Sequence, residues 1–373
     1  MKDVMGVIYT GEKDSFLREL TLMRAIAALP VAGRYRVIDF LVSGMVNSGI
    51  RNVGVIMQKN YHSLMDHLGS GKEWDLHGKN DGLYILPPFL TRENVGVYSG
   101  SLDALHSNMS YLRRSRQEYV LFCNSLIIFN PKFNGVFEEY AKGGCEAVMM
   151  YTDDPAMQRP EYGTYMDVDK DGMVVDVEID PTKPRYANTS LEVMLISKQL
   201  LMDLTDRGAA HGYHDLMRDV IQRMIRDAGL KVRGYKYNDL CYRMDSIQSY
   251  FNFNMDTLNP EVRHRLFPED RPIYTKVRDE LPARYLDEAK VVNSMVADGG
   301  IIDGTVEHSV LFRGVHVDKG ATVKNCIIMQ DSRIEEGAYL ENCVLDKQAR
   351  IKKDGRLIGP KSYPIVISKN MVI

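Results

Sequence analysis

The stretch VMGVIYTGEKDSFLRELTLMRAIAALPVAGRYRVIDF, residues 4–40, decides how the chain begins to fold. Its first part, Val4–Tyr9, is a short apolar run rich in β-branched residues, which predicts a buried first strand. In an α/β sheet, a phosphate-bearing ligand usually lies at the loop after this strand, where glycines let backbone N–H groups approach it. Here the loop Thr10–Phe16 has one glycine, and Glu12 and Asp14 would repel phosphate. The loop therefore has the position of a phosphate-binding loop without its chemistry.

The composition is typical of a soluble globular protein with two domains. The chain has 373 residues, 45% hydrophobic and 26% charged, with a formal net charge of −3. This balance gives no reason to expect nucleic acid or an acidic membrane as a partner. No apolar run of about 18 residues predicts a membrane-spanning helix, and the acidic N-terminus is unlike a signal peptide. The five cysteines, an odd number without metal-type spacing, predict free thiols and a cytoplasmic location.

The first two-thirds of the chain alternate strand-like and helix-like segments. Helical patterns such as residues 39–48 and 100–112 separate the apolar strands, which predicts an α/β fold with a mostly parallel, doubly wound, Rossmann-like sheet. From Tyr162 onward, short runs joined by turns such as residues 169–172 predict an antiparallel extension that covers one side of the sheet. The predicted strands of the parallel part are residues 4–9, 51–58, 82–88, 118–123 and 147–151.

A repeat with a period of seventeen indicates a second domain of a different kind. Val306, Val323 and Leu340 follow one another at this constant spacing, and an Asn-Cys dipeptide recurs with the same period. Within a repeat the apolar positions lie five or six apart, which predicts three flat faces per turn and hence a triangular parallel β-helix. Four prolines and many charges precede the repeat, as expected for a linker. The expected division is a first domain at 1–258, a linker at 259–290 and the β-helix at 291–373.

Several motifs occur together along nearly the whole chain. They are GRYRVIDF at 33–40, VNSGI at 46–50, VGVIMQ at 53–58, GSG at 69–71, WDL at 74–76, LPP at 86–88, NMD at 254–256 and GTVE at 304–307. In this combination the chain resembles the glucose-1-phosphate adenylyltransferase (ADP-glucose pyrophosphorylase) family of glycogen and starch synthesis. The resemblance implies a Rossmann-like nucleotidyltransferase domain followed by a left-handed parallel β-helix of hexapeptide-like repeats.

The catalytic residues that this resemblance implies are replaced. One family lysine falls at Ile26, and the lysine that contacts the sugar phosphate falls at Asp180. The first metal-binding aspartate would follow the fourth predicted strand, where the chain reads Cys123-Asn124-Ser125, and the second aligns with Arg243, two positions before Asp245. Nucleotidyl transfer brings two phosphates together, so magnesium and lysine must offset their charge. We therefore expect no catalytic residue, no metal ligand and no required cofactor.

The pattern of loss resembles the second, regulatory subunit that this family has in Gram-positive bacteria. That resemblance implies a catalytic ADP-glucose pyrophosphorylase subunit as partner in an allosteric heterotetramer, and a homo-oligomer when the chain is alone. Two other functions stay open. One is an active adenylyltransferase that holds Mg²⁺ through Asp245, and the other is a β-helix acyltransferase that uses His308 or His316 as a base.

Two sets of retained residues indicate ligand sites. Arg24, Arg34 and Arg36 resemble basic family positions near an effector site, and arginine is suited to clamp an anionic effector. Salt bridges are the alternative role for them. A second set resembles the family segment near nucleotide and sugar and predicts a vestigial pocket, with a helix start capped by a serine as the alternative. This second set is Gln58, Tyr98, Gly100, Ser101 and Asp103.

Overall fold

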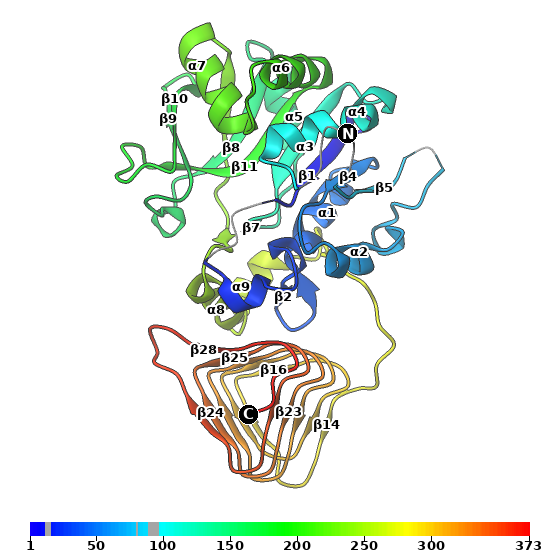
Figure 1. Ribbon diagram of the computed structural model, residues 1–373, viewed down its shortest axis with the longest axis vertical. Coiled ribbons are helices and arrows are strands. Elements are labelled where there is room, and N and C mark those ends of the chain that lie inside the picture. The colour runs from blue at the N-terminus through cyan, green and yellow to red at the C-terminus, as the bar shows by residue number, and fades with distance from the viewer. Residues whose placement is uncertain (12–15, 80, 89–96) are drawn as a thin grey trace. The chain divides into compact units, whose positions relative to one another are not determined.

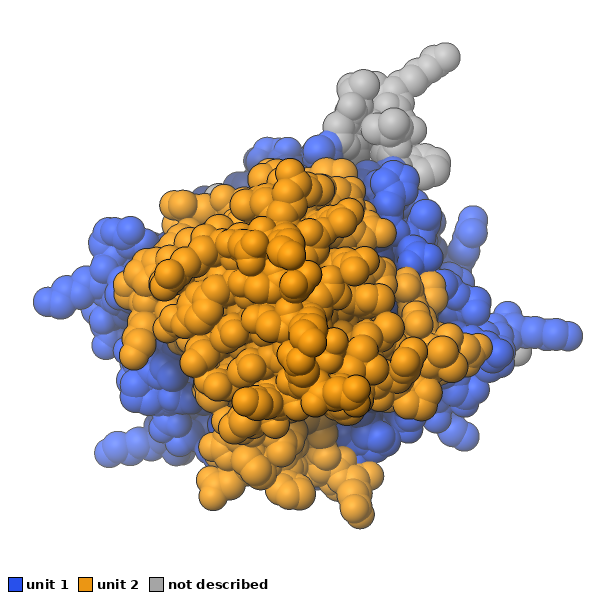
Figure 2. Space-filling view, turned by 90° about the horizontal axis from the view of Figure 1, so that it is seen from below, with its two compact units in different colours: residues 1–12, 40–243, 271–274 blue, residues 13–39, 244–270, 275–373 orange. Residues whose placement is uncertain are grey.

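The computed structural model describes residues 1–11, 16–79, 81–88 and 97–373 (Figure 1), so Glu12 and Asp14 of the first loop lie outside the described residues. The chain forms two compact units, coloured separately in Figure 2. Each unit is made of several separate stretches of sequence. The predicted domains at 1–258, 259–290 and 291–373 are consecutive ranges, so these units do not test them and that division stays a prediction. Unit 1 comprises residues 1–12, 40–243 and 271–274, and unit 2 comprises residues 13–39, 244–270 and 275–373.

Within the described part of the chain, unit 1 is built around a nine-stranded sheet in the order β5-β4-β1-β6-β11-β8-β12-β10-β9. β1 is parallel to both of its neighbours, β4 and β6. All six of its residues are buried, as expected for an apolar strand with both faces covered, which confirms the predicted first strand. The strands are β1 (Val4–Tyr9), β4 (Val53–Ile56), β5 (Leu83–Leu86), β6 (Tyr119–Asn124), β8 (Ala147–Thr152), β9 (Thr164–Val168), β10 (Met173–Ile179), β11 (Asn188–Ser197) and β12 (Val232–Lys236).

The sheet is less parallel than the sequence predicts. β11 runs antiparallel between β6 and β8 in the middle of the sheet, and β9 and β10 lengthen the same sheet at its edge. The segments from Tyr162 onward are antiparallel, as predicted, but they are strands of the main sheet, so the prediction that they cover one side of it is wrong. The physical reason lies in β11 itself, because its apolar run Val193–Ile196 is buried on both faces and therefore suits a central strand.

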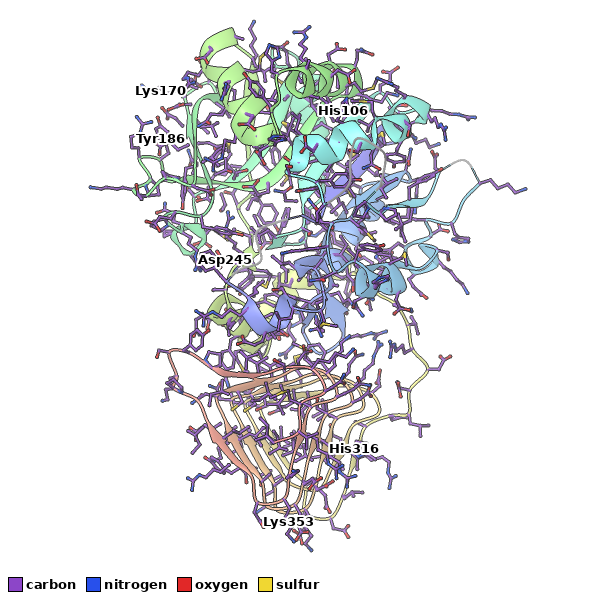
Figure 3. The ribbon with its side chains drawn as sticks, in the orientation of Figure 1. His106, Lys170, Tyr186, Asp245, His316 and Lys353 are labelled. Atoms are coloured by element: carbon purple, nitrogen blue, oxygen red, sulfur yellow. The ribbon has the colours of Figure 1, made fainter. Side chains whose placement is uncertain are left out.

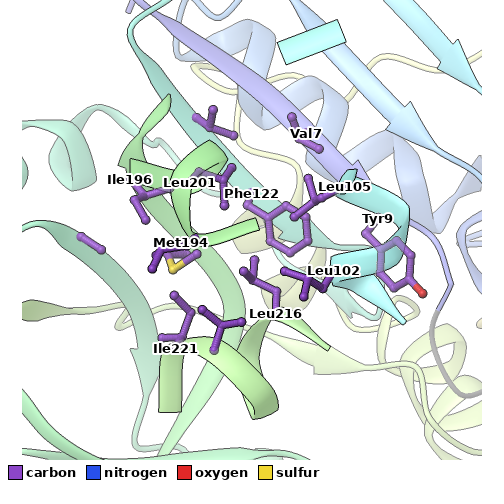
Figure 4. Close-up of a cluster of buried hydrophobic side chains, with 14 of the residues drawn as sticks. Val7, Tyr9, Leu102, Leu105, Phe122, Met194, Ile196, Leu201, Leu216 and Ile221 are labelled. Atoms are coloured by element: carbon purple, nitrogen blue, oxygen red, sulfur yellow. The ribbon is translucent and has the colours of Figure 1, made fainter. Parts of the chain in front are cut away.

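Helices cover this sheet and complete its core. Figure 4 shows Phe122 and Met194 from the sheet against Leu102 and Leu216. The helix expected over residues 100–112 is broken at Asn108, whose Nδ2 donates to the Ala104 carbonyl at 2.8 Å and so competes with the helix backbone. None of the helices in the described ranges combines the length and hydropathy needed to span a bilayer. These helices are α1 (Val37–Asn47), α2 (His62–Leu68), α3 (Ser101–Ser107), α4 (Met109–Arg114), α5 (Asn134–Ala141), α6 (Lys198–Ala210) and α7 (Gln222–Ala228), with a π-helical turn at Leu216–Ile221.

Unit 2 contains a parallel β-helix whose coils trace triangles in Figure 1. The registers Val306↔Val323 and Val323↔Leu340 confirm the predicted period of seventeen, whereas the preceding coil, Lys290↔Thr305, is shorter by two positions. One face consists of β14 (Arg284–Tyr285), β17 (Ile301–Ile302), β20 (His316–Val317), β23 (Arg333–Ile334) and β26 (Arg350–Ile351). The second consists of β15 (Lys290–Val292), β18 (Thr305–Glu307), β21 (Thr322–Lys324), β24 (Tyr339–Glu341) and β27 (Arg356–Ile358), and the third of β16 (Met295–Val296), β19 (Val310–Leu311), β22 (Ile327–Ile328), β25 (Cys343–Leu345) and β28 (Ile365–Ile367).

The recurring asparagine forms a ladder along one corner of the β-helix. His308, Asn325 and Asn342 have φ of 44°, 49° and 53°, a left-handed conformation that asparagine tolerates better than most residues. Asn325 contacts His308 on one side (Nδ1···Oδ1 3.1 Å) and Asn342 on the other. The side chain of Asn342 donates to the Gly359 carbonyl at 2.9 Å. The repeat therefore encodes a sharp corner as well as an apolar interior.

The third face of the β-helix is apolar on its outer side too. Val310, Ile327 and Val344 are buried, although their neighbours along each strand already fill the interior. Segments from elsewhere in unit 2 cover this face, as at Gly33, where a Cβ atom would lie 3.8 Å from Val310. The elements of unit 2 outside the β-helix are α8 (Ile247–Asp256), α9 (Pro260–Leu266), the 3₁₀ turns Arg18–Thr21 and Ile26–Ala28, and the hairpin of β2 (Pro30–Val31) and β3 (Tyr35–Arg36).

Candidate functional site

Gln58 and Tyr98 of the predicted vestigial pocket lie together in unit 1. Gln58 follows β4 and is buried, and its Nε2 donates to the Tyr9 hydroxyl at 3.1 Å and to the Tyr98 carbonyl at 2.9 Å. Among the described residues its Oε1 is buried without a hydrogen-bond partner, which costs about 1–3 kcal/mol unless another group donates to it. This free acceptor suits a donor such as the amino group of a nucleobase.

The other three residues of that set gather at the start of α3. Gly100 precedes the helix, and a Cβ atom there would lie 2.4 Å from the His214 carbonyl oxygen, so the close approach requires glycine. The alternative is confirmed for the helix start, because α3 begins at Ser101, but it is wrong for the cap, because the N-cap residue is Gly100 and no side chain caps the helix. The Ser101 hydroxyl donates to Asp215 Oδ2 at 3.2 Å and accepts from the Leu216 backbone N–H at 2.9 Å. Asp103 Oδ2 lies 2.9 Å from His214 Nδ1.

Arg243 occupies one of the two positions where the family resemblance implies a metal-binding aspartate, and the stretch Cys123-Asn124-Ser125 takes the place of the motif that carries the other. Arg243, in the short strand β13 (Tyr242–Arg243) that pairs with β7 (Ile127–Ile128), is buried. Asn124 Nδ2 donates to Glu192 Oε2 at 3.4 Å. Burial raises the pKa of Glu192 and the charge of Arg243 opposes that rise. Because a guanidinium repels cations and magnesium prefers carboxylate oxygens, the residues present do not fit Mg²⁺.

The remaining replaced positions are engaged in structural contacts. Asp180 pairs with Arg218 at 2.7 Å and accepts from the Gly163 N–H at 2.9 Å, and Ile26 is buried. Asp245, labelled in Figure 3, accepts from the Ser249 hydroxyl at 3.1 Å beside the start of α8. Within the described ranges, no three His, Cys, Asp or Glu side chains come close enough to hold a metal ion.

The two histidines of the β-helix have different surroundings. His308 belongs to the corner ladder, where it contacts Asn325. His316, labelled in Figure 3, alternates along β20 with the buried Val317 and therefore faces outward. The predicted acyltransferase role is untested by these contacts.

Arg24 and Arg36 of the predicted effector set lie near Asp346 and Lys347 of the β-helix, within unit 2. Arg24 Nη2 lies 2.8 and 2.9 Å from the two carboxylate oxygens of Asp346, and both side chains are 3% exposed. The salt-bridge alternative therefore holds for Arg24. Burial, and then the charges of Arg36 and Arg24, lower the pKa of Lys347 to about 7, while Asp346 opposes this shift. The Asp346 carboxylate thus lies among three basic groups, two of which lower the pKa of the third.

Arg34 belongs to a second basic group around Arg313. Arg313 is buried, and in the part of the chain that the structure describes its Nε has no hydrogen-bond partner. The pKa of Arg313 is lowered by burial and then by the charge of Arg34. Arg278 lowers the pKa of both Arg313 and Lys347, so it links the two groups. The sequence reasoning missed Lys347 and Arg313. A signal was present, because Arg313, Gln330 and Lys347 recur with the period of the repeat and therefore share one corner of successive coils.

Comparison with known protein families agrees with this fold. The nucleotidyl transferase family matches residues 5–257. The family described as GlmU-like, C-terminal hexapeptide, matches residues 282–362. These matches confirm the predicted architecture, a Rossmann-like nucleotidyltransferase domain followed by a left-handed parallel β-helix.

Individual relatives cover most of the chain. The glycogen biosynthesis protein GlgD of Bacillus subtilis (strain 168) is 35% identical over 85% of this chain and 81% of its own length. GlgD of Geobacillus stearothermophilus is 37% identical over 85% of this chain and 82% of its own length. The glucose-1-phosphate adenylyltransferase of Thermotoga neapolitana is 30% identical over 86% of this chain and 76% of its own length. The chain therefore belongs to the nucleotidyl transferase family, among the glucose-1-phosphate adenylyltransferases and the GlgD proteins that resemble them.

Proposed function

We propose that this chain is a regulatory, catalytically impaired subunit of ADP-glucose pyrophosphorylase in glycogen biosynthesis. It would act by modulating a catalytic partner subunit in a heterotetramer that makes ADP-glucose from ATP and glucose 1-phosphate. Similarity to two GlgD proteins over 85% of the chain supports the assignment to glycogen biosynthesis. The observation that carries the loss of catalysis is the buried Arg243, which stands where the family resemblance implies a metal-binding aspartate and whose charge acts on the neighbouring Glu192.

The charge balance explains why the loss would be severe. Transfer of a nucleotidyl group places a sugar phosphate against the α-phosphate of ATP, so positive groups must offset the developing charge. Each such group contributes roughly 3 kcal/mol in the transition state. The chain has Ile26 and Asp180 in place of two lysines, and a guanidinium cannot coordinate phosphate oxygens as a metal ion does. Losses of this size at several positions together would remove nearly all of the rate.

The proposed regulation uses the basic groups of unit 2 as an anionic effector site. Arg24, Arg36 and Lys347 lie around the carboxylate of Asp346, and the charge of Arg34 lowers the pKa of Arg313. Phosphate-bearing effectors suit such a site because guanidinium groups donate several hydrogen bonds to oxyanions.

The test is to mix the chain with a catalytic subunit and measure ADP-glucose formation. We expect the two to co-purify, the mixture to exceed the catalytic subunit alone in rate or in effector response, and this chain alone to be nearly inactive with Mg²⁺, ATP and glucose 1-phosphate. A chain that neither binds the catalytic subunit nor alters its rate would refute the proposal. Turnover by the chain alone that is lost in Asp245→Ala would instead establish an active adenylyltransferase.

A further inference from the structure

One column of side chains in the interior of the β-helix contains two thiols. Ser309, Cys326 and Cys343 follow one another with the repeat period of seventeen, and all three are buried. In each coil the Oγ or Sγ atom lies near the carbonyl oxygen two positions earlier, at 2.8, 3.0 and 3.2 Å in this order. The three residues therefore occupy the same place in successive coils. We name Cys326 and Cys343 the thiol pair.

The thiol pair meets the distance requirement of a disulfide bond. The strands that hold the two cysteines in place are paired in register, with Ile327 opposite Val344. Neighbouring strands lie about 4.8 Å apart, and the Cα atoms of disulfide-bonded cysteines usually lie about 4.4–6.8 Å apart. Both side chains belong to the apolar core inside the coils, and all five cysteines of the chain are free thiols. The thiol pair can therefore be joined without a change of register.

The two thiols have different chemical characters. Contact with the Cys326 thiol lowers the pKa of Cys343, and burial opposes this shift. Burial, and then contact with Cys343, raises the pKa of Cys326. Because the thiolate is the reactive form of cysteine, Cys343 is the one that reacts first with an oxidant. An attacking thiol with a second thiol beside it is the arrangement that resolves a sulfenic acid into a disulfide.

A thin layer of protein separates the thiol pair from water. Ile365 pairs with Cys343 in the next coil, and the Leu357 carbonyl oxygen lies 3.7 Å from Cys343 Sγ. Both of these covering residues are partly exposed. Local opening of this one coil would admit a small molecule such as hydrogen peroxide, whereas a tripeptide such as oxidised glutathione would need a larger part of the β-helix to unfold.

We propose that the thiol pair is an oxidation site, at which hydrogen peroxide closes a disulfide bond between successive coils of the β-helix. The Cys343 sulfur attacks one peroxide oxygen, so an S–O bond forms while the O–O bond breaks, and the released hydroxide leaves as water with the thiol proton. The Cys326 sulfur then attacks the Cys343 sulfur, the S–S bond forms, the S–O bond breaks, and a second water leaves with the Cys326 proton. Two thiols are oxidised and one peroxide is reduced.

The bond would have a structural consequence in the β-helix. A cross-link between positions seventeen apart constrains the unfolded chain, so the oxidised protein should unfold at a higher urea concentration than the reduced protein. The link would also fix β25, which begins at Cys343 and ends directly before Asp346, the partner of Arg24. This proposal concerns the chain alone and does not depend on the regulatory role.

The experiment maps the cysteines of the folded full chain after exposure to hydrogen peroxide. The peroxide is removed with catalase, the remaining thiols are blocked with iodoacetamide in urea, and the chain is cut with trypsin. Cleavage after Lys324, Arg333 and Lys347 places the two cysteines on separate peptides, 325–333 and 334–347. We expect mass spectrometry to find these peptides joined, with the mass of two hydrogens missing, and separated again by dithiothreitol. Two alkylated peptides, or a sulfinic acid on Cys343 without the link, would overturn the proposal.

Serine substitutions test whether the change in stability comes from the bond. Ser309 shows that serine fits this column, so Cys326→Ser and Cys343→Ser should fold. Peroxide should raise the urea midpoint of the original chain and of the control Cys145→Ser, which changes a partly exposed cysteine outside the β-helix, and dithiothreitol should reverse the rise. Neither variant of the thiol pair should show it. An equal rise in Cys326→Ser would refute the proposal, and the peptide map of Cys145→Ser decides it if the other variants do not fold.

Discussion

Replacing Asp346 by alanine removes the carboxylate that balances the buried guanidinium of Arg24. We expect the free energy of unfolding to fall by about 3–5 kcal/mol, because breaking one side of a buried ion pair leaves an uncompensated charge. The estimate follows from the geometry, since both oxygens of Asp346 are within 2.9 Å of Arg24 Nη2 and both side chains are 3% exposed. Water therefore cannot replace the lost partner, and Arg36 and Lys347 add like charges nearby.

The assay is urea unfolding followed by far-UV circular dichroism, with the variant's midpoint compared at an unchanged slope. Glu307→Ala is the matched control, because Glu307 pairs with Lys324 at 3.1 Å on the same β-helix but the two side chains are 42% and 38% exposed. That exposed pair is expected to contribute about 0–1 kcal/mol. A loss below ~1 kcal/mol for Asp346→Ala, or one equal to the control, would refute the reasoning from burial.

Anions provide a second measurement on the same variant. If the basic groups form an anion site, phosphate should replace the missing carboxylate, and phosphate at about 100 times its Kd would return about 2.7 kcal/mol. Sodium chloride at the same ionic strength separates specific binding from screening. A phosphate effect no larger in Asp346→Ala than in the original chain would count against an anion site around Arg24 and Lys347.

Three further predictions concern single positions. Burial and neighbouring arginines hold the pKa of Lys347 at about 7, below its ordinary value near 10.4, so the unfolded chain holds more protons between these values and stability should rise with pH in that window, by at most ~1.4 kcal/mol per pH unit. Lys347→Met should remove this component, and parallel stability–pH curves for the two proteins would contradict it. Asn325→Ala should destabilise the β-helix by about 1–3 kcal/mol through its φ of 49° and its lost ladder contacts, whereas Asn325→Gly should cost less in the same urea titration; equal losses would exclude strain as a cause. Gly100→Ala should cost about 1–3 kcal/mol, because its Cβ would lie 2.4 Å from the His214 carbonyl, and an unchanged thermal midpoint would show that α3 can shift freely.

The parts of the fold that follow from local periodicity could be predicted from sequence. The repeating coil is one, because each face must bury its apolar positions against the next coil, so the spacing of Val306, Val323 and Leu340 is the spacing of the structure. β1 is another, since a short apolar run suits only a strand with both faces covered. The place of β11 between β6 and β8 depends on long-range pairing, which its own residues do not specify.

The sites were less predictable than the fold for a physical reason. The family resemblance pointed to Arg24 and Arg36, but the lowered pKa of Lys347 arises from residues that are distant in sequence and close in space. Glu192 looks like an ordinary strand residue until its left-handed φ is known. Charge and strain of this kind depend on the assembled tertiary structure, and no local pattern encodes them.

The contact between Arg24 and Asp346 spans 322 residues of sequence. A ribosome that adds 5–20 residues each second would need roughly 15–60 s to deliver the second residue after the first. During that interval the Arg24 guanidinium must stay hydrated, because its partner Asp346 has not yet been synthesised. A stop codon placed just before Asp346 would therefore act at the opposite end of the polypeptide, because Arg24 would lose the carboxylate that its guanidinium binds.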